Sequence, residues 1–329
     1  MKLSELGEKK IVSALTKGLY TRDFVTLSAG LDDAAAIHRL GEEIVFTSDI
    51  MFESSHFPAG MKPEEMGWKA AAANISDVAA MGAKPLAFLA SFGLPPSLDL
   101  SYVRAISRGI NGACRAHQCP FVGGDTKKAG ELTICGSVIG SCQSKSALLR
   151  RGNARPGDVV CVTGSLGDAA CGAQILLKGK KLNPQADKKL LNSFLKPRAQ
   201  IKAGLALSSL GAEIAGMDIT DGLFYSANEI ATASGCGIRI HEDMLPFSEE
   251  AKKFAHSILR ASPVRILEWG EDYELLVSMR RKDFPRAKAA VEAAGGRLIC
   301  IGEAIGEKTV YLDGEKVDVH GYDAFLAKR

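Results

Sequence analysis

Carboxylates and hydroxyls recur in this chain where an apolar segment meets a turn, often a glycine-rich one. Six stretches carry them: "AGLDDAAAI", "FTSDI", "NISDVAAM", "CPFVGGDT", "GMDITDGL" and "EWGEDYELLV". In α/β folds ligands gather at the carboxyl ends of strands, so these side chains could converge. The residues concerned are Asp32, Asp33, Thr47, Ser48, Asp49, Asp77, Asp125, Asp218, Asp221, Glu271 and Asp272.

Converging carboxylates repel one another, and burying even one without a partner is costly. Hard cations make such a cluster tolerable, and Mg²⁺ prefers oxygen ligands while keeping several waters. Magnesium bound in this way usually also holds substrate phosphates. The pattern therefore predicts a magnesium site, at which an apolar strand over 44–47 ends in Thr47, Ser48 and Asp49.

Each of these residues can also be explained by a structural role that involves no ligand. Asp77 lies inside a helix predicted over 64–81, where it is equally well explained as the N-cap of a shorter helix that starts near Ser76. A single histidine such as His56 is more often structural, and the glycine pair 123–124 could be a simple turn. Four acids, taken singly, are explained as turn formers or N-caps: Asp32, Asp33, Asp218 and Asp221.

The stretch "CVTGSLGDAACG" (161–172) runs from a strand through two glycines to a helix N-terminus. Backbone N–H groups at such a place could hold an anion. The common phosphate, dinucleotide, kinase, zinc-protease and hydrolase motifs do not occur in the sequence. Any ATP chemistry must therefore use another arrangement.

Strand-like and helix-like segments alternate through the chain, which predicts α/β or α+β layers. A polar stretch, "LRRGNARPGD" (149–158), separates two halves, so we place a domain boundary between residues 149 and 150. The first half predicts strands 44–47, 86–92, 120–123 and 131–142 and helices 64–81 and 99–117. The second predicts strands 158–163, 213–217, 237–241, 273–279 and 297–301 and helices 167–178, 187–208, 223–234, 248–259 and 283–294.

The length, charge and apolar pattern of the chain limit the kinds of protein that it can be. A chain of 329 residues is long enough for two domains, and a formal charge of +3 is too small to indicate a nucleic-acid partner. The first twenty residues lack a signal-peptide core and predict an amphipathic helix from Leu6, Ile11, Val12, Leu15 and Leu19. No apolar run is long enough to span a membrane. We expect a soluble, cytoplasmic protein whose eight cysteines are mostly small buried hydrophobes.

Taken in order, the motifs resemble those of the thiamine-monophosphate kinases. The matching stretches are "GLDDAAAI", "FTSDIMFESSHF", "GWKAAAANISDVAAMGAKP", "VGGDT", "RRGNARPGDVVCVTGSLGDAACG", "MDITDGL" and "WGEDYELL". They cover the chain from about residue 25 to "GYDAF" near its C-terminus. This family belongs to a superfamily with aminoimidazole ribonucleotide synthetase, selenophosphate synthetase and a hydrogenase maturation protein.

The resemblance implies a two-domain α/β (α+β) subunit of the aminoimidazole-ribonucleotide-synthetase type. Residues 1–149 would bind ATP and metal and pair with a second copy into a dimeric β-barrel, and residues 150–329 would form a C-terminal α/β domain. The implied reaction transfers the γ-phosphoryl group of ATP to thiamine monophosphate with the help of several Mg²⁺ ions. Phosphoryl transfer mainly needs positioning and electrostatic stabilisation, so no protein base is expected.

The resemblance also implies roles for particular residues. Arg151 would contact the ATP phosphates, with Gly124, Asp125 and Thr220 as further nucleotide contacts. His56, Glu271 and Tyr322 would contact the substrate. The metal ligands would be Asp33, Thr47, Ser48, Asp49, Asp77, Asp125, Asp218 and Asp221.

The sequence departs from the family pattern at three places. Leu31 stands where the family usually has glycine, "TDG" replaces "SDG", and "RGNA" replaces "RSGA". The last change leaves open whether Arg150 or Arg151 contacts phosphate. Two other functions stay possible: an ATP-dependent ligase or cyclase that activates an amide, and a non-catalytic nucleotide-binding relative.

Overall fold

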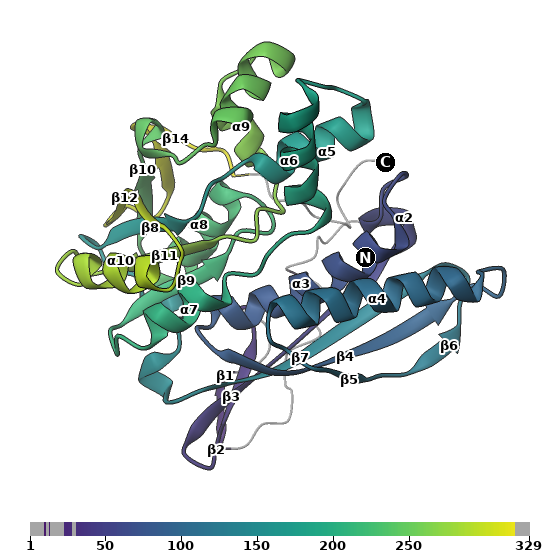
Figure 1. The fold of residues 1–329 in the computed structure, drawn as a ribbon. Helices are drawn as coiled ribbons and strands as arrows, with labels where there is room; N and C mark the ends of the chain where they lie inside the picture. Colours follow the sequence, from purple (N-terminus) through teal and green to yellow (C-terminus); the bar gives the residue numbers. More distant parts are fainter. Residues whose placement is uncertain (1–9, 11–12, 14–22, 28–30, 320–329) are drawn as a thin grey trace.

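The computed structural model describes residues 10, 13, 23–27 and 31–319 of the chain. Most positions of the predicted N-terminal amphipathic helix lie outside these residues, and so does Tyr322. The described part contains two mixed seven-stranded sheets with helices packed around them (Figure 1).

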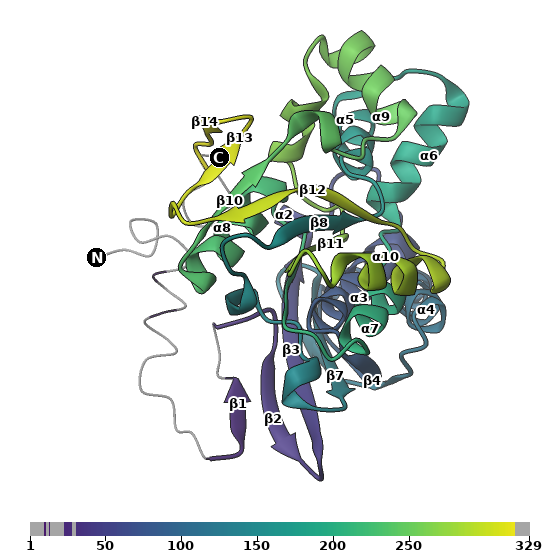
Figure 2. The same ribbon diagram turned by 90° about the vertical axis from the view of Figure 1, so that its left-hand side faces the viewer.

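The first sheet is built from the N-terminal half and has the order β1-β2-β3-β7-β4-β5, with β6 also paired to β4. Its pairs are antiparallel except that β5 and β6 run parallel to β4. Helices α3 and α4 cover one face of the sheet, and the opposite face has no covering layer of described elements (Figures 1 and 2). The strands are β1 (Val25–Leu27), β2 (Ala35–Arg39), β3 (Glu42–Phe52), β4 (Lys84–Leu94), β5 (Phe121–Gly123), β6 (Thr126–Lys128) and β7 (Thr133–Cys142).

The second sheet is built from the C-terminal half and has the order β14-β13-β10-β12-β8-β11-β9. All its pairs are antiparallel except β10 with β13. The strands are β8 (Val159–Thr163), β9 (Ile214–Asp218), β10 (Gly237–Ile240), β11 (Leu275–Met279), β12 (Leu298–Ile305), β13 (Val310–Leu312) and β14 (Glu315–Lys316). Strands β8, β9 and β11 are buried along their whole length, as their continuous apolar runs predict.

Helices fill the space between and around the sheets. The α-helices are α2 (Glu53–His56), α3 (Pro63–Ala80), α4 (Leu100–Ala116), α5 (Asp168–Lys178), α6 (Pro184–Leu195), α7 (Ile201–Ser208), α8 (Leu223–Ser234), α9 (Glu249–Phe254) and α10 (Phe284–Ala293). Short 3₁₀ turns lie at η2 (Lys145–Ala147), η3 (Arg151–Asn153), η4 (Glu242–Met244) and η6 (Pro263–Glu268), and a π-helical turn η5 (Ala255–Leu259) follows α9. No described helix is both long enough and apolar enough to cross a membrane.

Helix α3 is the central element of the molecule. It starts at Pro63, and Glu65 reaches back to accept a 2.8 Å hydrogen bond from the Lys62 N–H. Its alanines contact the first sheet, α4, α7 and β9, so one hydrophobic core runs from the first half of the chain into the second. Against α4 the backbones almost touch, because a Cβ at Gly67 would lie 2.0 Å from the Ile106 carbonyl oxygen.

Two predicted elements were wrong. The strand expected over 44–47 does not end at Thr47: β3 continues to Phe52 and pairs with β7 throughout. The helix expected over 187–208 is two helices, because Pro197 cannot continue α6. Helix α3, in contrast, runs without a break through Ser76, so Asp77 is not the N-cap of a second helix.

The cysteines behave as expected from the sequence. All eight cysteines are free thiols, and six of them are buried.

The predicted domain boundary, between residues 149 and 150, falls in the segment that joins β7 to β8 and stays a prediction.

Candidate active site

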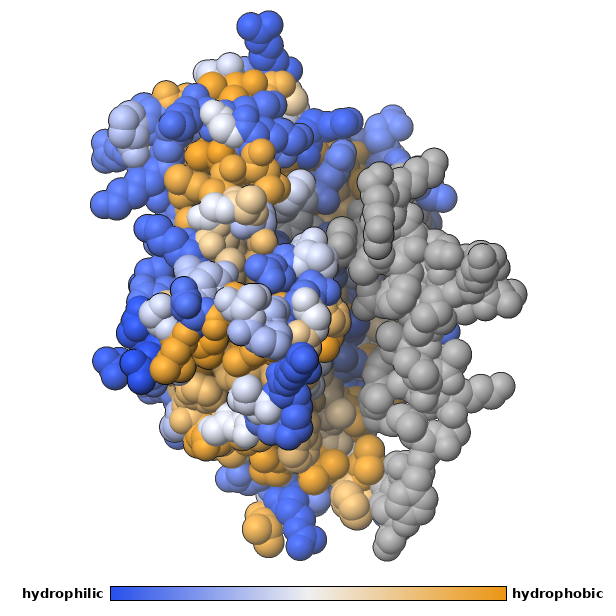
Figure 3. Space-filling view, turned by 90° about the vertical axis from the view of Figure 1, so that its right-hand side faces the viewer, coloured by the Kyte–Doolittle hydropathy of each residue, from blue (hydrophilic) through white to orange (hydrophobic). Residues whose placement is uncertain are grey.

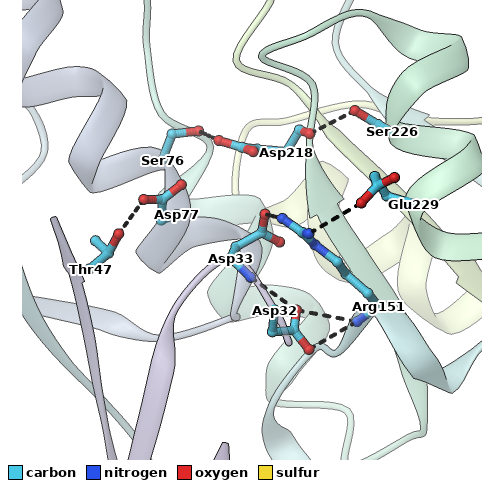
Figure 4. A network of polar contacts seen from close by, with 9 residues as sticks. All are labelled: Asp32, Asp33, Thr47, Ser76, Asp77, Arg151, Asp218, Ser226 and Glu229. Atoms are coloured by element: carbon cyan, nitrogen blue, oxygen red, sulfur yellow. Dashed lines mark hydrogen bonds and ion pairs between the residues drawn. The ribbon is translucent and has the colours of Figure 1, made fainter. Parts of the chain in front are cut away.

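Three aspartates from distant parts of the chain meet beside the N-terminal half of the core. Asp33 precedes β2, Asp77 lies on α3, and Asp218 is the last residue of β9 (Figure 4). Each offers a carboxylate oxygen, and these oxygens lie within 4.8 Å of one another. We call these three residues the acidic cage.

Hydrogen bonds from hydroxyl and amide groups on α3 and β3 position the aspartates of the cage and the neighbouring strand. The Thr47 hydroxyl donates to Asp77, and the Ser76 hydroxyl donates to Asp218 at 2.5 Å (Figure 4). Asp49 follows Thr47 on the same side of β3, and its N–H donates to the buried Asn74 amide oxygen at 2.9 Å. Thr47 and Asp49 therefore lie within a continuous strand, on the face that α3 covers.

Burial and mutual repulsion dominate the electrostatics of the cage. Burial raises the pKa of Asp77 well above its ordinary value, and the Asp49, Asp218 and Asp33 charges raise it further. Burial, followed by the charge of Asp33, also raises the pKa of Asp218. One oxygen of Asp33, Oδ2, is buried and has no hydrogen-bond partner among the described residues.

These observations fit a divalent cation. A cluster of buried carboxylates with an unsatisfied oxygen is unfavourable by itself and becomes favourable when a cation neutralises it. Aspartate oxygens and a threonine hydroxyl are suitable ligands for Mg²⁺. Asp33, Asp77 and Asp218, with Thr47 and Asp49 beside them, are the residues that would hold it.

Arg151 lies at the edge of the acidic cage. Its guanidinium pairs with Asp33 and lies 3.9 Å from the Glu229 carboxylate on α8 (Figure 4). Its backbone N–H donates to both carboxylate oxygens of Asp32, at 3.2 and 3.3 Å. Burial, then the neighbouring Asp33 charge, raises the pKa of Asp32 to about 7. Of the two candidate arginines, Arg151 has its guanidinium paired with a carboxylate of the cage, that of Asp33.

The predicted substrate contacts His56 and Glu271 also come together, joined by a residue that the sequence analysis did not select. The Lys69 ammonium lies 2.7 Å from the Glu271 carboxylate and 3.4 Å from the His56 carbonyl oxygen. Lys69 belongs to α3, whereas Glu271 belongs to the loop before β11.

The His56 ring has a defined tautomer in this setting. Its Nδ1 accepts a 3.2 Å hydrogen bond from the Phe52 N–H, so the neutral ring carries its proton on Nε2. Burial, then the nearby Lys69 charge, lowers the pKa of His56 below its ordinary value. The ring can therefore offer Nε2–H as a hydrogen-bond donor at neutral pH.

Some predicted site residues do not have their side chains in the cage. The Ser48 hydroxyl donates at 2.8 Å to the Gly136 carbonyl, on the face of β3 opposite to Thr47. Asp125 is exposed between β5 and β6 and lies 3.3 Å from Lys127. Their metal roles stay predictions.

The remaining predicted residues lie in loops between the described helices and strands. At Gly124 a Cβ would be 1.7 Å from the Ala90 carbonyl oxygen, so only glycine fits there. Thr220 accepts a 2.7 Å hydrogen bond from the Glu271 N–H through its carbonyl. Asp221 follows it, two residues before α8 begins. The roles of these three residues also stay predictions, and Leu31 is exposed.

The helix N-terminus suggested as an anion site holds an anion of the chain itself. The Asp272 carboxylate accepts hydrogen bonds from the N–H groups of Gly167, at 2.9 Å, and Ala169. Residue 272 thus caps α5, and the expected external anion has no place on these donors.

Four residues of the site were not predicted: Lys69, Asn74, Ser76 and Glu229. The first three are polar side chains on an alanine-rich helix, which was the available signal in "WKAAAANISD". Their partners could not be read from the sequence, because Asp218 and Glu271 are 142 and 202 residues away from Ser76 and Lys69.

Comparisons with known proteins identify the family of this chain. The families "AIR synthase related protein, N-terminal domain" and "AIR synthase related protein, C-terminal domain" match residues 31–142 and 155–315. The thiamine-monophosphate kinase of Pyrococcus abyssi is 36% identical over 302 residues, covering 91% of this chain and 90% of the relative. The one from Aquifex aeolicus is 32% identical, covering 99% and 100%.

Comparison with solved structures indicates the same family. AaThiL complexed with AMPPCP and TMP matches with a TM-score of 0.86 at 31% identity, covering 98% of this chain and 99% of that one. The hydrogenase maturation protein HypE, in its complex with HypF, shares the fold at 20% identity with a TM-score of 0.71. The chain therefore belongs to the thiamine-monophosphate kinase family, within the AIR synthase related proteins.

Proposed function

We propose that this protein transfers the γ-phosphoryl group of ATP to the phosphate of thiamine monophosphate, giving thiamine diphosphate and ADP. The observation that carries the proposal is the acidic cage, formed by Asp33, Asp77 and Asp218 at the meeting point of the two halves. It is supported by the likeness, over nearly the whole chain, to a structure that holds AMPPCP and TMP.

The chain's own residues supply positioning and charge. Arg151 offers a planar, permanently charged guanidinium, which suits the phosphates of ATP, and Gly124, Asp125 and Thr220 are further proposed nucleotide contacts. His56 offers Nε2–H to the phosphate of the acceptor, and Glu271 contacts its thiamine portion. Tyr322, the third proposed substrate contact, lies outside the described residues.

Both substrates are anions, so positive charge must offset the electrostatic repulsion between them when they approach each other. The acidic cage would hold Mg²⁺, with Thr47, Ser48, Asp49, Asp125 and Asp221 as further proposed ligands. When bound, the metal supplies neutralisation of the phosphate charges. The acceptor oxygen belongs to a phosphate that is already ionised, so no side chain needs to remove a proton from it.

The proposed quaternary structure is a homodimer in which the uncovered faces of two N-terminal sheets form a β-barrel. Figure 3 shows apolar side chains gathered at the lower end of the molecule, where Figure 1 draws this sheet. Large apolar residues of the sheet are exposed: Phe46, Ile50, Leu86, Leu89 and Val122. Exposed apolar groups of this extent on a sheet usually mark an interface.

The cytoplasmic location of the protein stays a prediction.

The function is tested by incubating the purified protein with ATP, Mg²⁺ and thiamine monophosphate and separating the products by chromatography. We expect thiamine diphosphate and ADP in equal amounts, and neither in the presence of EDTA or with Asp49→Ala. Thiamine monophosphate recovered unchanged while ATP still binds would overturn the proposal. Amide substrates would then test the ligase or cyclase function, and loss of all turnover would indicate the non-catalytic relative.

A further inference from the structure

A lysine is buried at the centre of the proposed substrate site. Lys69 is only 2% exposed and is among the largest fully buried side chains of the described structure. Its ammonium lies 4.9 Å from the centre of the Phe194 ring, 2.7 Å from the Glu271 carboxylate and 3.4 Å from the His56 carbonyl oxygen. One cation therefore contacts α6, the loop before β11 and the end of α2.

Packing alone does not explain this choice of residue. Taking an ammonium and a carboxylate out of water costs several kcal/mol per ion, and an apolar pair of similar size is often as stable. The neighbours of Lys69 on α3 are mainly apolar residues, none of which requires a cation. A buried lysine paired with Glu271, whose side chain is 27% exposed, is therefore better explained by what it holds in place.

The loop that carries Glu271 has an uncommon backbone. Glu271 and Tyr273 have φ values of 73° and 53°, in the left-handed region that side chains other than glycine rarely adopt. Hydrogen bonds from the Glu271 N–H to the Thr220 carbonyl (2.7 Å) and from the Tyr273 N–H to the Ile219 carbonyl (3.0 Å) fix it. The loop backbone is thus held by the chain before α8, and the side chain of Glu271 by Lys69.

The Lys69 ammonium lies close to both carboxylate oxygens of Glu271. It donates a 2.7 Å hydrogen bond to Oε1 and lies 2.7 Å from Oε2. One cation therefore holds the whole carboxylate in a single orientation, which agrees with the proposed contact between Glu271 and the thiamine portion.

We infer that Lys69 is a positioning residue for the acceptor substrate: it fixes the Glu271 carboxylate, and with it the His56 backbone, in the geometry that binds thiamine monophosphate. This inference rests on the proposed function. It makes Lys69 specific for the acceptor, because none of its contacts with the residues that the structure describes involves Arg151 or the acidic cage.

The test compares Lys69→Met, Lys69→Arg, Glu271→Gln and the double variant Lys69→Met/Glu271→Gln. The KM for each substrate and kcat are measured by steady-state kinetics, and circular dichroism checks that each variant is folded. We expect Lys69→Met to raise the KM for thiamine monophosphate by about tenfold or more, with the KM for ATP changed by less than about twofold. Lys69→Arg should recover part of the affinity, because it retains a cation.

The double variant provides a second criterion. If Lys69 acts through Glu271, then Lys69→Met/Glu271→Gln should be no worse than Glu271→Gln alone. Lys196→Met is the matched control, because its ammonium also lies over an aromatic ring, that of Trp68 at 5.8 Å, but has no carboxylate partner among the described ion pairs. It should keep the wild-type KM for both substrates.

Two results would overturn the inference. One is a folded Lys69→Met enzyme with the wild-type KM for thiamine monophosphate, and the other is a double variant whose effects simply add. If Lys69→Met does not fold, Lys69→Arg and Glu271→Gln decide: equal losses of affinity for both substrates would exclude an acceptor-specific role. A wild-type protein that fails to phosphorylate thiamine monophosphate would instead refute the proposed function, so the two failures are distinguishable.

Discussion

Asp77 lies within a helix yet faces Asp33, Asp49 and Asp218, and all four carboxylates compete for the same charge compensation. Replacing it by asparagine removes one negative charge and retains an oxygen that can accept from Thr47. We therefore expect Asp77→Asn to lower activity by at least about 100-fold, because the metal site is incomplete. In metal-free buffer the same variant should melt higher, by about 2–4 °C, because it lacks the carboxyl whose ionisation is opposed in the fold by burial and by the neighbouring charges.

Thermal melts with and without MgCl₂ check this prediction. The wild-type melting temperature should rise with Mg²⁺, and that of Asp77→Asn should rise less. Asp99→Asn is the control, since it makes the same charge change at the exposed N-cap of α4. An Asp77→Asn protein that is less stable than the wild type in EDTA would show that the carboxylate has a structural role instead.

At the residue scale, the sequence predicts the acids of the cage but not the residues that position the site's carboxylates. Asp33, Asp77 and Asp218 could be chosen because the motifs that contain them resemble those of a family in which the matching residues are metal ligands. Lys69 and Ser76 could not, because a polar side chain on an alanine-rich helix shows its purpose only when its partner is known.

At the scale of secondary structure, the segment that enters β11 is tied to the end of β8 by one carboxyl group. Glu274 accepts a 2.6 Å hydrogen bond from the Thr163 hydroxyl, which itself accepts from the Leu275 N–H at 2.8 Å. Burial raises the pKa of Glu274 to about 7. In the unfolded chain the carboxyl should titrate near the ordinary glutamate value of about 4.3.

The direction of the pH effect follows from these two values. Between them the unfolded chain loses the Glu274 proton while the folded chain keeps it, so this group destabilises the fold increasingly as pH rises and fully above pH 7. Glu274→Gln removes the effect and retains an acceptor for Thr163. Its free energy of unfolding should match the wild type near pH 4 and exceed it by about 1–3 kcal/mol at pH 8.5.

Urea unfolding at both pH values measures this difference, with the exposed Glu315→Gln as control. A stability gain of Glu274→Gln that is the same at both pH values would contradict the account, because the raised pKa would then contribute nothing.

The elements themselves were mostly predictable, and the exceptions have physical causes. Strand β3 runs past Thr47 because it stays paired with β7 as far as Phe52, and ladder hydrogen bonds outweigh the polarity of its side chains. The break between α6 and α7 was visible in the sequence as Pro197. Strands β1, β2, β6, β13 and β14 were missed because short strands at the margins of a sheet carry little periodicity.

At the scale of the whole molecule, the uncovered face of the first sheet should bury itself against a second copy. Leu89 on β4 is 46% exposed on this face, and Leu177 on α5 is 48% exposed elsewhere, which makes them a matched pair. The wild type should sediment at twice the mass of one chain. Leu89→Lys should sediment as a monomer, because a charge in an apolar interface is costly, and Leu177→Lys should remain a dimer.

Analytical ultracentrifugation at micromolar concentration decides between these states. A monomeric wild type, or a Leu89→Lys protein that stays dimeric, would mean that this face does not form the interface.

The arrangement of the two halves was beyond sequence reasoning. Strand order in both sheets brings together segments that are far apart in the chain, such as β8 with β12, and no local pattern specifies such pairs. The hydrophobic core also continues through α3 from one half to the other, although the motifs favoured two separate units.

The most direct test of the central claim follows one phosphoryl group. The protein is mixed with thiamine monophosphate, Mg²⁺ and ATP that carries a radioactive γ-phosphoryl group, and the products are separated. The account predicts that label appears in thiamine diphosphate, with one ADP formed for each diphosphate, and that EDTA abolishes the transfer. Label recovered only as inorganic phosphate or unchanged ATP, with no labelled diphosphate, would contradict it.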